Sequence, residues 1–209
     1  MWDLVKEGKT DEEIGKILEI NPRSNEATFL KGRVHLARRE FNEAITLFQP
    51  YVKDNPKSPP GHYYLGLAQL GNKDVQQAKA ELAEAVKLNP NWIEARLTLG
   101  EIQRGSGAVD LAREEAQEVL KRDPKSVQAN LILGNVYLLK RDIPRASKSF
   151  DEVIQIAPEN PIGYYQKGRV VLAQKKEKEA LARLEDALRI QPNFLDPLNL
   201  IAAVYVNQK

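Results

Sequence analysis

The sequence predicts an all-α solenoid of stacked antiparallel helix hairpins, because three residue ladders recur with one interval of 34 residues. The proline ladder comprises Pro22, Pro56, Pro90, Pro124, Pro158 and Pro192. The glycine ladder comprises Gly32, Gly66, Gly100, Gly134 and Gly168. The alanine ladder comprises Ala44, Ala78, Ala112, Ala146 and Ala180. Self-similarity at a fixed period of this length indicates a repeat protein.

The ladders divide the chain into full repeats flanked by two partial ones. We expect five full repeats, at residues 25–58, 59–92, 93–126, 127–160 and 161–194. A partial repeat is expected at 1–24, and a lone first helix at 195–209. This last segment carries an apolar face where natural arrays end in a polar capping helix, so we expect a piece cut from a longer array.

The N-terminal partial repeat predicts a single helix. Thr10 and Glu13 have the spacing of a capping box, in which each side chain bonds to the other residue's backbone N–H. The apolar residues that follow recur at helical intervals, and they are Ile14, Ile17, Leu18 and Ile20.

Each full repeat carries the pattern of two helices joined by a short turn. In residues 127–160, apolar residues recur every three or four positions in each half, with a polar break at 140–142. The ladder proline ends the second helix, because the residue before a proline is pushed out of the helical region. No part of a repeat has the alternating pattern of a strand.

The glycine and alanine ladders mark the contact between the two helices of a hairpin, where larger side chains would hold them apart. One turn further along the second helix, large apolar residues fill the space, namely Phe48, Leu82, Phe150 and Leu184. A single hairpin cannot bury its apolar face, so we expect neighbouring hairpins to stack.

Two irregularities interrupt the pattern. Pro50 lies inside a second helix, where it removes a backbone hydrogen bond, so we expect a kink or early fraying at residues 49–51. In the third repeat, Gly105 and Gly107 soften the turn and Ala116 replaces the large apolar residue. We therefore expect this repeat to be the most loosely packed and the most flexible.

This pattern resembles the tetratricopeptide repeat, with Gly at position 8, Ala at 20, a large apolar residue at 24 and Pro at 32 of each unit. The resemblance covers nearly the whole chain and is strongest at Leu65-Gly66, Leu99-Gly100 and Leu133-Gly134. Position 4, often Trp in the family, departs from it with Thr28, His62, Arg96, Asn130 and Tyr164. The resemblance implies a right-handed superhelix, similar to arrays of prokaryotic members, whose concave face binds proteins or peptides.

On a helical wheel, positions 5, 9 and 12 of each first helix lie opposite the core-facing positions 4, 7, 8 and 11. Position 5 holds Phe29, Tyr63, Leu97, Leu131 and Tyr165. Position 9 holds Arg33, Leu67, Glu101, Asn135 and Arg169. Position 12 holds Leu36, Leu70, Arg104, Leu138 and Leu172. An apolar stripe with a polar rim marks an interaction surface, so we expect these groove positions to line a site for a peptide or partner protein.

An alternative exists for some of the groove positions. Leu97, Leu131 and Leu138 also suit packing between neighbouring repeats. A clamp for the C-terminal carboxylate of heat-shock chaperones, which some family members carry, is not expected, because only Asn135 matches the residues that such a clamp requires.

Composition argues against several other functions. Lys and Arg number 31 and Asp and Glu 29, so a net charge of +2 gives no reason to expect a nucleic-acid partner. The chain has no cysteine, and its two histidines lack a neighbouring ligand set, so we expect no metal, no cofactor and no catalytic residue. No apolar run approaches the ~20 residues that span a bilayer, so we expect no direct membrane insertion.

The sequence therefore predicts a non-enzymatic scaffold that binds a protein or peptide. One alternative is a regulatory or substrate-recruiting arm of a larger enzyme or envelope assembly factor. A second is a structural array that associates through the exposed face of the last helix, formed by Leu198, Ile201, Val204 and Tyr205. The compartment stays open between the cytoplasm and the bacterial periplasm or envelope.

Overall fold

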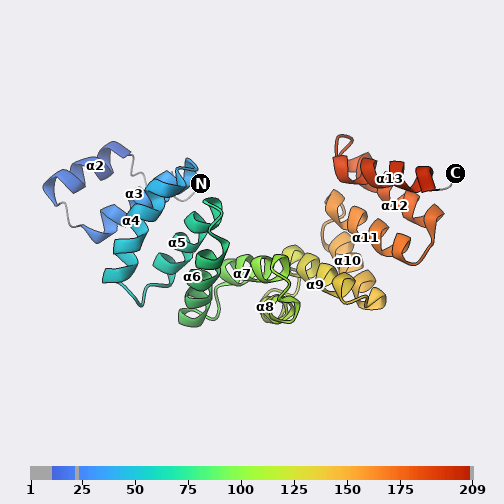
Figure 1. Cartoon of the computed structure of the whole chain (residues 1–209), viewed down its shortest axis with the longest axis horizontal. Helices are drawn as coiled ribbons and strands as arrows, with labels where there is room; N and C mark the ends of the chain where they lie inside the picture. Colours follow the sequence, from blue (N-terminus) through green and yellow to red (C-terminus); the bar gives the residue numbers. More distant parts are fainter. Residues whose placement is uncertain (1–10, 22–23, 208–209) are drawn as a thin grey trace. The chain divides into compact units, whose positions relative to one another are not determined.

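The computed structural model describes residues 11–21 and 24–207, and within this part of the chain it contains helices and turns but no strand. Successive antiparallel helices follow one another along the chain (Figure 1). The predicted all-α solenoid is confirmed. Contacts between residues divide the chain into two units, unit 1 ending at Leu99 and unit 2 beginning at Gly100.

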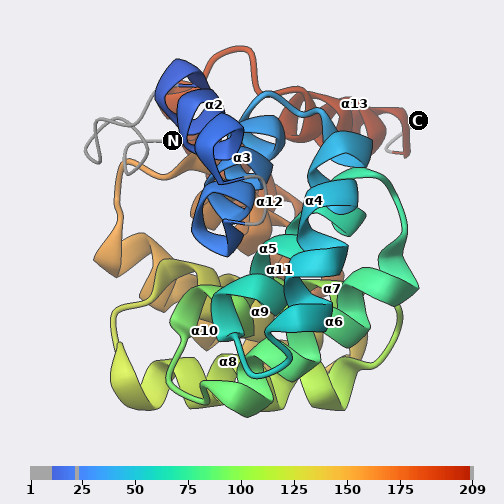
Figure 2. The same cartoon turned by 90° about the vertical axis from the view of Figure 1, so that its left-hand side faces the viewer.

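Unit 1 contains α2 (Asp11–Ile20), α3 (Asn25–Ala37), α4 (Phe41–Asp54), α5 (Pro59–Gly71) and α6 (Val75–Leu88). Each helix packs on the next, and α3 also contacts α5 (Figure 2). Helix α7 (Ile93–Gly105) begins in unit 1 and ends in unit 2. The predicted capping box begins at Thr10, which lies outside the described residues.

Unit 2 continues with α8 (Val109–Arg122), α9 (Val127–Leu139), α10 (Ile143–Ile156), α11 (Pro161–Ala173), α12 (Glu177–Ile190) and α13 (Leu195–Asn207). From α8 to α13, each helix again packs on the next. None of the described helices is both long enough and apolar enough to cross a bilayer.

The first helices of several repeats begin at a side-chain cap. Ser24, Ser58 and Ser126 accept a hydrogen bond from the backbone N–H three residues later, at 3.2, 3.2 and 3.3 Å. Asn160 caps α11 by accepting from Ile162 N, two residues later, at 3.0 Å. Such a cap satisfies one of the backbone donors that a helix leaves unpaired at its start. Before α7 and α13, the same place in the repeat is taken by Trp92 and Phe194.

The turn between the two helices of each hairpin has one residue with positive φ. These residues are Arg39, Lys73, Gly107, Arg141 and Lys175, with φ of 63, 70, 80, 58 and 62°. The third repeat closes its turn with a bond from Ala108 N to Gln103 O of 2.8 Å, as the first does from Glu40 N to His35 O at 2.9 Å. The turn predicted to be soft thus has the same geometry as the others, and its flexibility stays a prediction.

The glycine ladder lies against the second helix of its own hairpin. A Cβ on Gly32, Gly66 or Gly168 would stand 2.6–2.8 Å from Phe48, Leu82 or Leu184. A Cβ on Gly134 would overlap the ring of Phe150.

Gly100 is the exception in the glycine ladder, because Ala116 takes the place of the large residue opposite it. The nearest atom to a Cβ on Gly100 would be 3.4 Å away. Ile132 of α9 lies 3.5 Å from the same point, so part of the space that Ala116 leaves is filled from the next repeat.

Early fraying of α4 at residues 49–51 does not occur, because the helix continues through Pro50 to Asp54, and the kink stays a prediction. The turn after the proline is held by packing and by its cap. The ring of Tyr51 lies 4.8 Å from that of Phe29. The backbone N and the side-chain Nδ2 of Asn55 both donate to Tyr51 O, each at 2.9 Å.

The last helix exposes part of the face predicted for it. Leu198 is 42% and Tyr205 53% exposed, and Ile201 is half-buried. Val204 is only 4% exposed, so its predicted exposure is wrong. Since α13 packs on α12, Val204 belongs to the buried side of the helix.

Candidate partner-binding site

Unit 2 contains a hollow of about 300 Å³ formed by three first helices, α7, α9 and α11. It is lined by Arg104, Asn135, Leu138, Leu139, Arg169 and Ala173. Four of these are predicted groove positions, namely Arg104, Asn135, Leu138 and Arg169. We call this feature the α7–α9–α11 hollow.

The repeat explains why these side chains meet. Within a helix, residues three or four apart share a face, so Asn135 and Leu138 point to the same side of α9. Arg104 is the counterpart of Leu138 one repeat earlier, and Arg169 is the counterpart of Asn135 one repeat later. Stacked hairpins therefore bring the same face of successive first helices to one surface.

The polar side of the hollow is organised by hydrogen bonds. Arg169 Nη1 donates to Gln166 Oε1 at 2.6 Å and to Asn135 Oδ1 at 3.5 Å. Its guanidinium also lies 5.8 Å from the centre of the Tyr165 ring. Asn135 Nδ2 donates to Leu131 O at 2.9 Å. These contacts hold an exposed guanidinium at the rim.

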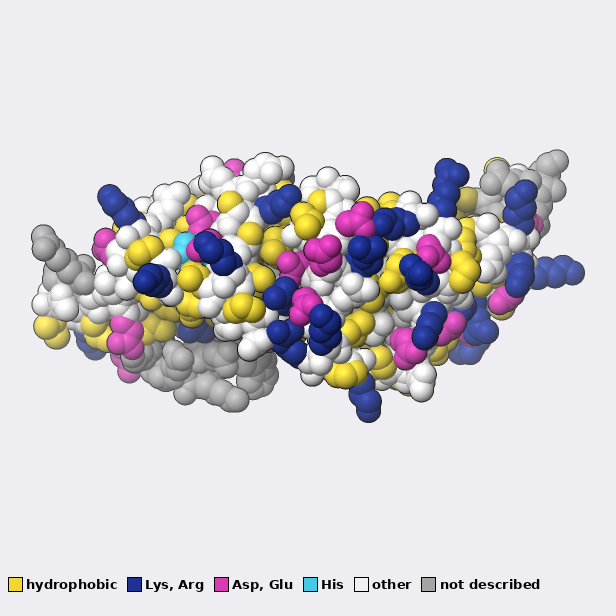
Figure 3. All heavy atoms as spheres, turned by 90° about the horizontal axis from the view of Figure 1, so that it is seen from below, with side chains coloured by type: hydrophobic (Ala, Val, Ile, Leu, Met, Phe, Trp, Pro, Cys, Tyr) yellow, Lys and Arg dark blue, Asp and Glu magenta, His cyan; other side chains and the backbone are white. Residues whose placement is uncertain are grey.

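A second guanidinium is closely paired with a carboxylate. Arg104 Nε donates to Glu101 Oε2 at 2.8 Å, and Glu101 Oε1 accepts from Gln128 Nε2 at 3.0 Å. Because Glu101 offsets the charge of Arg104, the hollow is cationic mainly at Arg169. On the face drawn in Figure 3, Lys and Arg side chains are mixed with Asp and Glu.

The leucines near the hollow differ in exposure. Leu131 is 7% exposed and belongs to a core cluster with Ala146, Phe150, Val153 and Val170. Its side chain therefore packs mainly against α10 of its own hairpin, and Val170 is the cluster's member from the next repeat. Leu138 packs on the same cluster and also lines the hollow. Leu139, which was not among the groove positions, is 59% exposed and supplies accessible apolar surface to the hollow.

The remaining groove positions of unit 2 lie on α11. Tyr165 is half-buried, and its ring centre is 5.4 Å from that of Phe194. Leu172 is half-buried. Phe194 was missed because it stands outside the first helices, at the place where other repeats carry a cap.

In unit 1 the groove positions at the start of the first helices join an aromatic cluster. Phe29 lies 5.7 Å from Phe48 and 5.5 Å from Tyr64. Tyr63 lies 5.3 Å from Tyr64 and 4.5 Å from Trp92. These rings therefore pack on one another, and Tyr64 and Trp92 were not among the groove positions.

The other groove positions of unit 1 are half-buried, namely Arg33, Leu36, Leu67, Leu70 and Leu97. The guanidinium of Arg33 lies 5.1 Å from the centre of the Tyr64 ring. Leu36 packs on a core cluster that includes Ala44 and Phe48.

The hydroxyl of Tyr63 has a partner within the chain. Burial raises the pKa of Tyr63 above its ordinary value, and the hydrogen bond with Thr98 opposes this shift. The hydroxyl is therefore neutral at physiological pH, and it is already engaged on one side.

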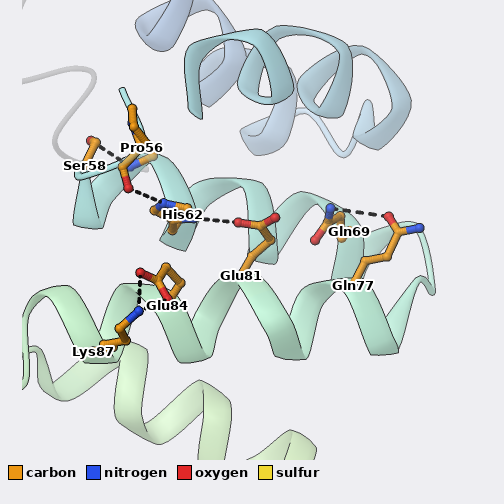
Figure 4. Close-up of polar contacts among 9 residues, drawn as sticks. Pro56, Ser58, His62, Gln69, Gln77, Glu81, Glu84 and Lys87 are labelled. Atoms are coloured by element: carbon orange, nitrogen blue, oxygen red, sulfur yellow. Dashed lines mark hydrogen bonds and ion pairs between the residues drawn. The ribbon is translucent and has the colours of Figure 1, made fainter. Parts of the chain in front are cut away.

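Both histidines bond to a glutamate. His62 Nδ1 lies 2.6 Å from Glu81 Oε2, and its Nε2 lies 3.0 Å from Pro56 O (Figure 4). His35 Nδ1 lies 2.6 Å from Glu40 Oε2. In the described part of the chain, no three His, Asp or Glu residues are grouped closely enough to hold a metal ion.

Comparisons with known proteins agree with this architecture. The model of the family described as tetratricopeptide repeat matches residues 17–59, 29–91 and 97–161. No curated protein sequence matches the chain.

Several solved structures share the fold. YrrB, described as a TPR protein with an unusual peptide-binding site, has 16% identity and a TM-score of 0.74, covering 90% of this chain and 96% of its own. MamA from Desulfovibrio magneticus has 17% identity and a TM-score of 0.76, covering 82% and 97%. A thermophilic TPR protein from Thermus thermophilus has 23% identity and a TM-score of 0.66, covering 88% and 100%.

The matched residues span most of the chain, and they include every residue of the glycine, alanine and proline ladders up to Pro158. This chain belongs to the tetratricopeptide repeat family.

Proposed function

We propose that the chain is a non-enzymatic protein-interaction scaffold, and that the α7–α9–α11 hollow binds a segment of a partner protein. The observation that carries this proposal is the meeting of Arg104, Asn135, Leu138 and Arg169 around one hollow of about 300 Å³. Pockets of this size, with a few converging polar groups and apolar walls, are the usual form of a ligand site.

The chemistry of the hollow favours a segment with one apolar side chain next to an acceptor. Leu138 and Leu139 offer an apolar wall for the side chain. The guanidinium of Arg169, held at the rim, can donate to a backbone carbonyl or a carboxylate of the segment. The peptide-binding site described for YrrB, which has the same fold, is consistent with this proposal.

A peptide-display selection on the immobilised chain tests this function. Selected peptides are then titrated by calorimetry against the wild-type chain and against Leu139→Asp, which puts a charge on the exposed apolar wall. We expect Leu139→Asp to weaken binding by at least ~10-fold, since one apolar contact with its desolvation is worth about 1.5–3 kcal/mol.

The matched control is Leu111→Asp on α8, because Leu111 is 46% exposed in the same unit and does not line the hollow. Leu111→Asp should bind like the wild type. Selected peptides that bind Leu139→Asp and Leu111→Asp equally well would remove the hollow from the proposal.

The exposed side of α13 favours a second candidate function, which is association of the chain with copies of itself. Leu195, Leu198, Tyr205 and Val206 are 69, 42, 53 and 71% exposed on this one helix. Apolar surface of this kind is commonly buried against a partner.

A further inference from the structure

A second cavity, of about 480 Å³, lies in unit 2 between the end of α8, α9 and α10. It is lined by Leu120, Pro124, Asn130, Leu133, Tyr137 and Ser149, among others. The residues that α9 contributes, Asn130, Leu133 and Tyr137, lie about 160° around the helix from those that it contributes to the α7–α9–α11 hollow. This cavity is therefore separate from the α7–α9–α11 hollow, and what it binds does not depend on the proposed function.

In the second repeat, the corresponding place is filled by the chain itself. Pro56, His62 and Glu81 lie two repeats of 34 residues before Pro124, Asn130 and Ser149. The imidazole of His62 bridges Pro56 O at 3.0 Å and Glu81 Oε2 at 2.6 Å (Figure 4). His62 is 8% exposed, so its ring is a buried plug between the two helices.

The third repeat fills this place in a related way. Arg96 stands at the position of His62, and its Nε donates to Pro90 O at 2.7 Å. In both repeats a flat group with an N–H donor therefore binds the carbonyl of the ladder proline.

The fourth repeat lacks this plug. Asn130 is too short to imitate His62, and its Nδ2 donates to Ser126 O at 3.1 Å instead. Ser149 replaces the carboxylate, and its short side chain lines the cavity. Asn130 and Ser149 are 6 and 7% exposed, so the cavity presents two buried polar side chains.

The residues that line the cavity indicate which chemical group of a partner it suits. Leu120, Leu133 and the ring of Tyr137 form an apolar and aromatic wall. Arg145 and Lys148 stand at the cavity with Glu152, and the guanidinium of Arg145 lies 5.7 Å from the centre of the Tyr137 ring. Two cations nearby disfavour a third, so a neutral N–H donor suits the cavity better than a guanidinium.

We propose that this cavity is a docking pocket for an indole side chain of a partner protein. The indole ring would pack on Leu133 and Tyr137, with its N–H directed to the carbonyl of Pro124 or the hydroxyl of Ser149. Indole is donor-only and carries a large apolar ring, which matches an acceptor at the end of an apolar wall. Trp is also among the residues that most often anchor protein interfaces.

The test uses N-acetyl-tryptophanamide as the probe, titrated into the ¹⁵N-labelled chain and followed by NMR. We expect saturable shifts in the millimolar range, confined to amides at the end of α8 and in α9 and α10. N-acetyl-phenylalaninamide, which lacks the ring N–H, should bind at least fivefold more weakly. Scattered or non-saturating shifts, or equal binding of the two probes, would overturn the proposal.

A plug variant tests the position of the pocket. Asn130→His together with Ser149→Glu installs the pair found in the second repeat and should abolish binding of N-acetyl-tryptophanamide. Asn130→His alone should weaken it. Leu139→Asp, in the other hollow, should leave it unchanged. If a folded plug variant binds the probe as the wild type does, the cavity is not the docking pocket, and the comparison of the two probes stands even if the double variant does not fold.

Discussion

At the scale of single residues, the packing within a hairpin decides whether a ladder glycine can be replaced by a larger residue. Gly134 faces the fully buried ring of Phe150, whereas a Cβ on Gly100 would meet only Glu115, Ile132 and Ala112 at 3.4–3.7 Å. The two glycines occupy the same place in neighbouring repeats of one unit, so they form a matched pair. Their difference lies only in what a methyl group would meet.

We predict opposite effects for Gly134→Ala and Gly100→Ala. Gly134→Ala should destabilise unit 2 by about 1–3 kcal/mol, because the added methyl group overlaps a ring that has no room to move. Gly100→Ala should stabilise it by about 0.5–1 kcal/mol, because Ala is the better helix former and only ordinary contacts are made. Urea unfolding followed by circular dichroism measures both, and equal midpoints for the two variants would contradict this account.

Tyr63 gives a residue-scale prediction with a pH dependence. Its folded-state pKa is raised, so its contribution to stability is present below the unfolded pKa and is lost as pH rises through the folded value. We expect unit 1 to lose stability at alkaline pH, and Tyr63→Phe to reduce that loss.

At neutral pH, Tyr63→Phe should cost about 1 kcal/mol, because the hydrogen bond with Thr98 is removed. Thermal unfolding at neutral and alkaline pH measures both effects. An alkaline loss of stability that is unchanged in Tyr63→Phe would show that another group causes it.

At the scale of helices and turns, the ladders predicted the all-α fold, because each ladder residue has one physical task in every repeat. The helical wheel did not assign position 10 of the first helix to the core. At this position Ala68, Ile102, Val136 and Val170 are buried. The residues at position 10 are all apolar, so the sequence did contain evidence that this position is buried. The continuation of α4 past Pro50 depends on contacts of Tyr51 and Asn55, which spacing does not reveal.

The candidate site was predicted less completely, because burial depends on neighbours in other repeats. Leu131 and Leu97 have the same place in their repeats, but Leu131 is buried by Phe150, Val153 and Val170. The pairs Tyr63 with Trp92 and Tyr165 with Phe194 could have been noticed, since an aromatic replaces the cap in both cases. What the aromatics contact follows only from the three-dimensional packing.

The turn between hairpin helices supports an element-scale prediction in unit 2. Gly107 and Arg141 occupy the same positive-φ place, with φ of 80 and 58°. We expect Gly107→Arg to destabilise unit 2 by about 1 kcal/mol, and Arg141→Gly to stabilise it by a smaller amount, because side chains with a Cβ are disfavoured in this conformation.

The control for the turn is Gly105→Ala, because Gly105 ends α7 without positive φ and a Cβ there would meet nothing within 4 Å. This variant should be neutral or stabilising. Chemical denaturation of the three variants measures the differences. A Gly107→Arg variant as stable as the wild type would show that the turn tolerates a side chain.

At the scale of the whole molecule, the exposed face of α13 predicts concentration-dependent association. Leu198→Glu combined with Tyr205→Lys should shift the chain toward the monomer in sedimentation velocity, whereas Leu111→Asp should not. The change is on one helix, so the helical content should stay constant. A wild-type chain that sediments as a monomer at every concentration would rule out this second function.

The plug formed by His62 and Glu81 has a consequence for how such arrays diversify. Substitutions at two positions, which lie on the two helices of one hairpin, would open or close a cavity. The backbone would not have to change. The reverse exchange, His62→Asn with Glu81→Ser, would then open a cavity in unit 1, and the residues that line this cavity would set its binding specificity. In such an array, a new binding cavity would then need only two substitutions within one repeat, with the helices left in place.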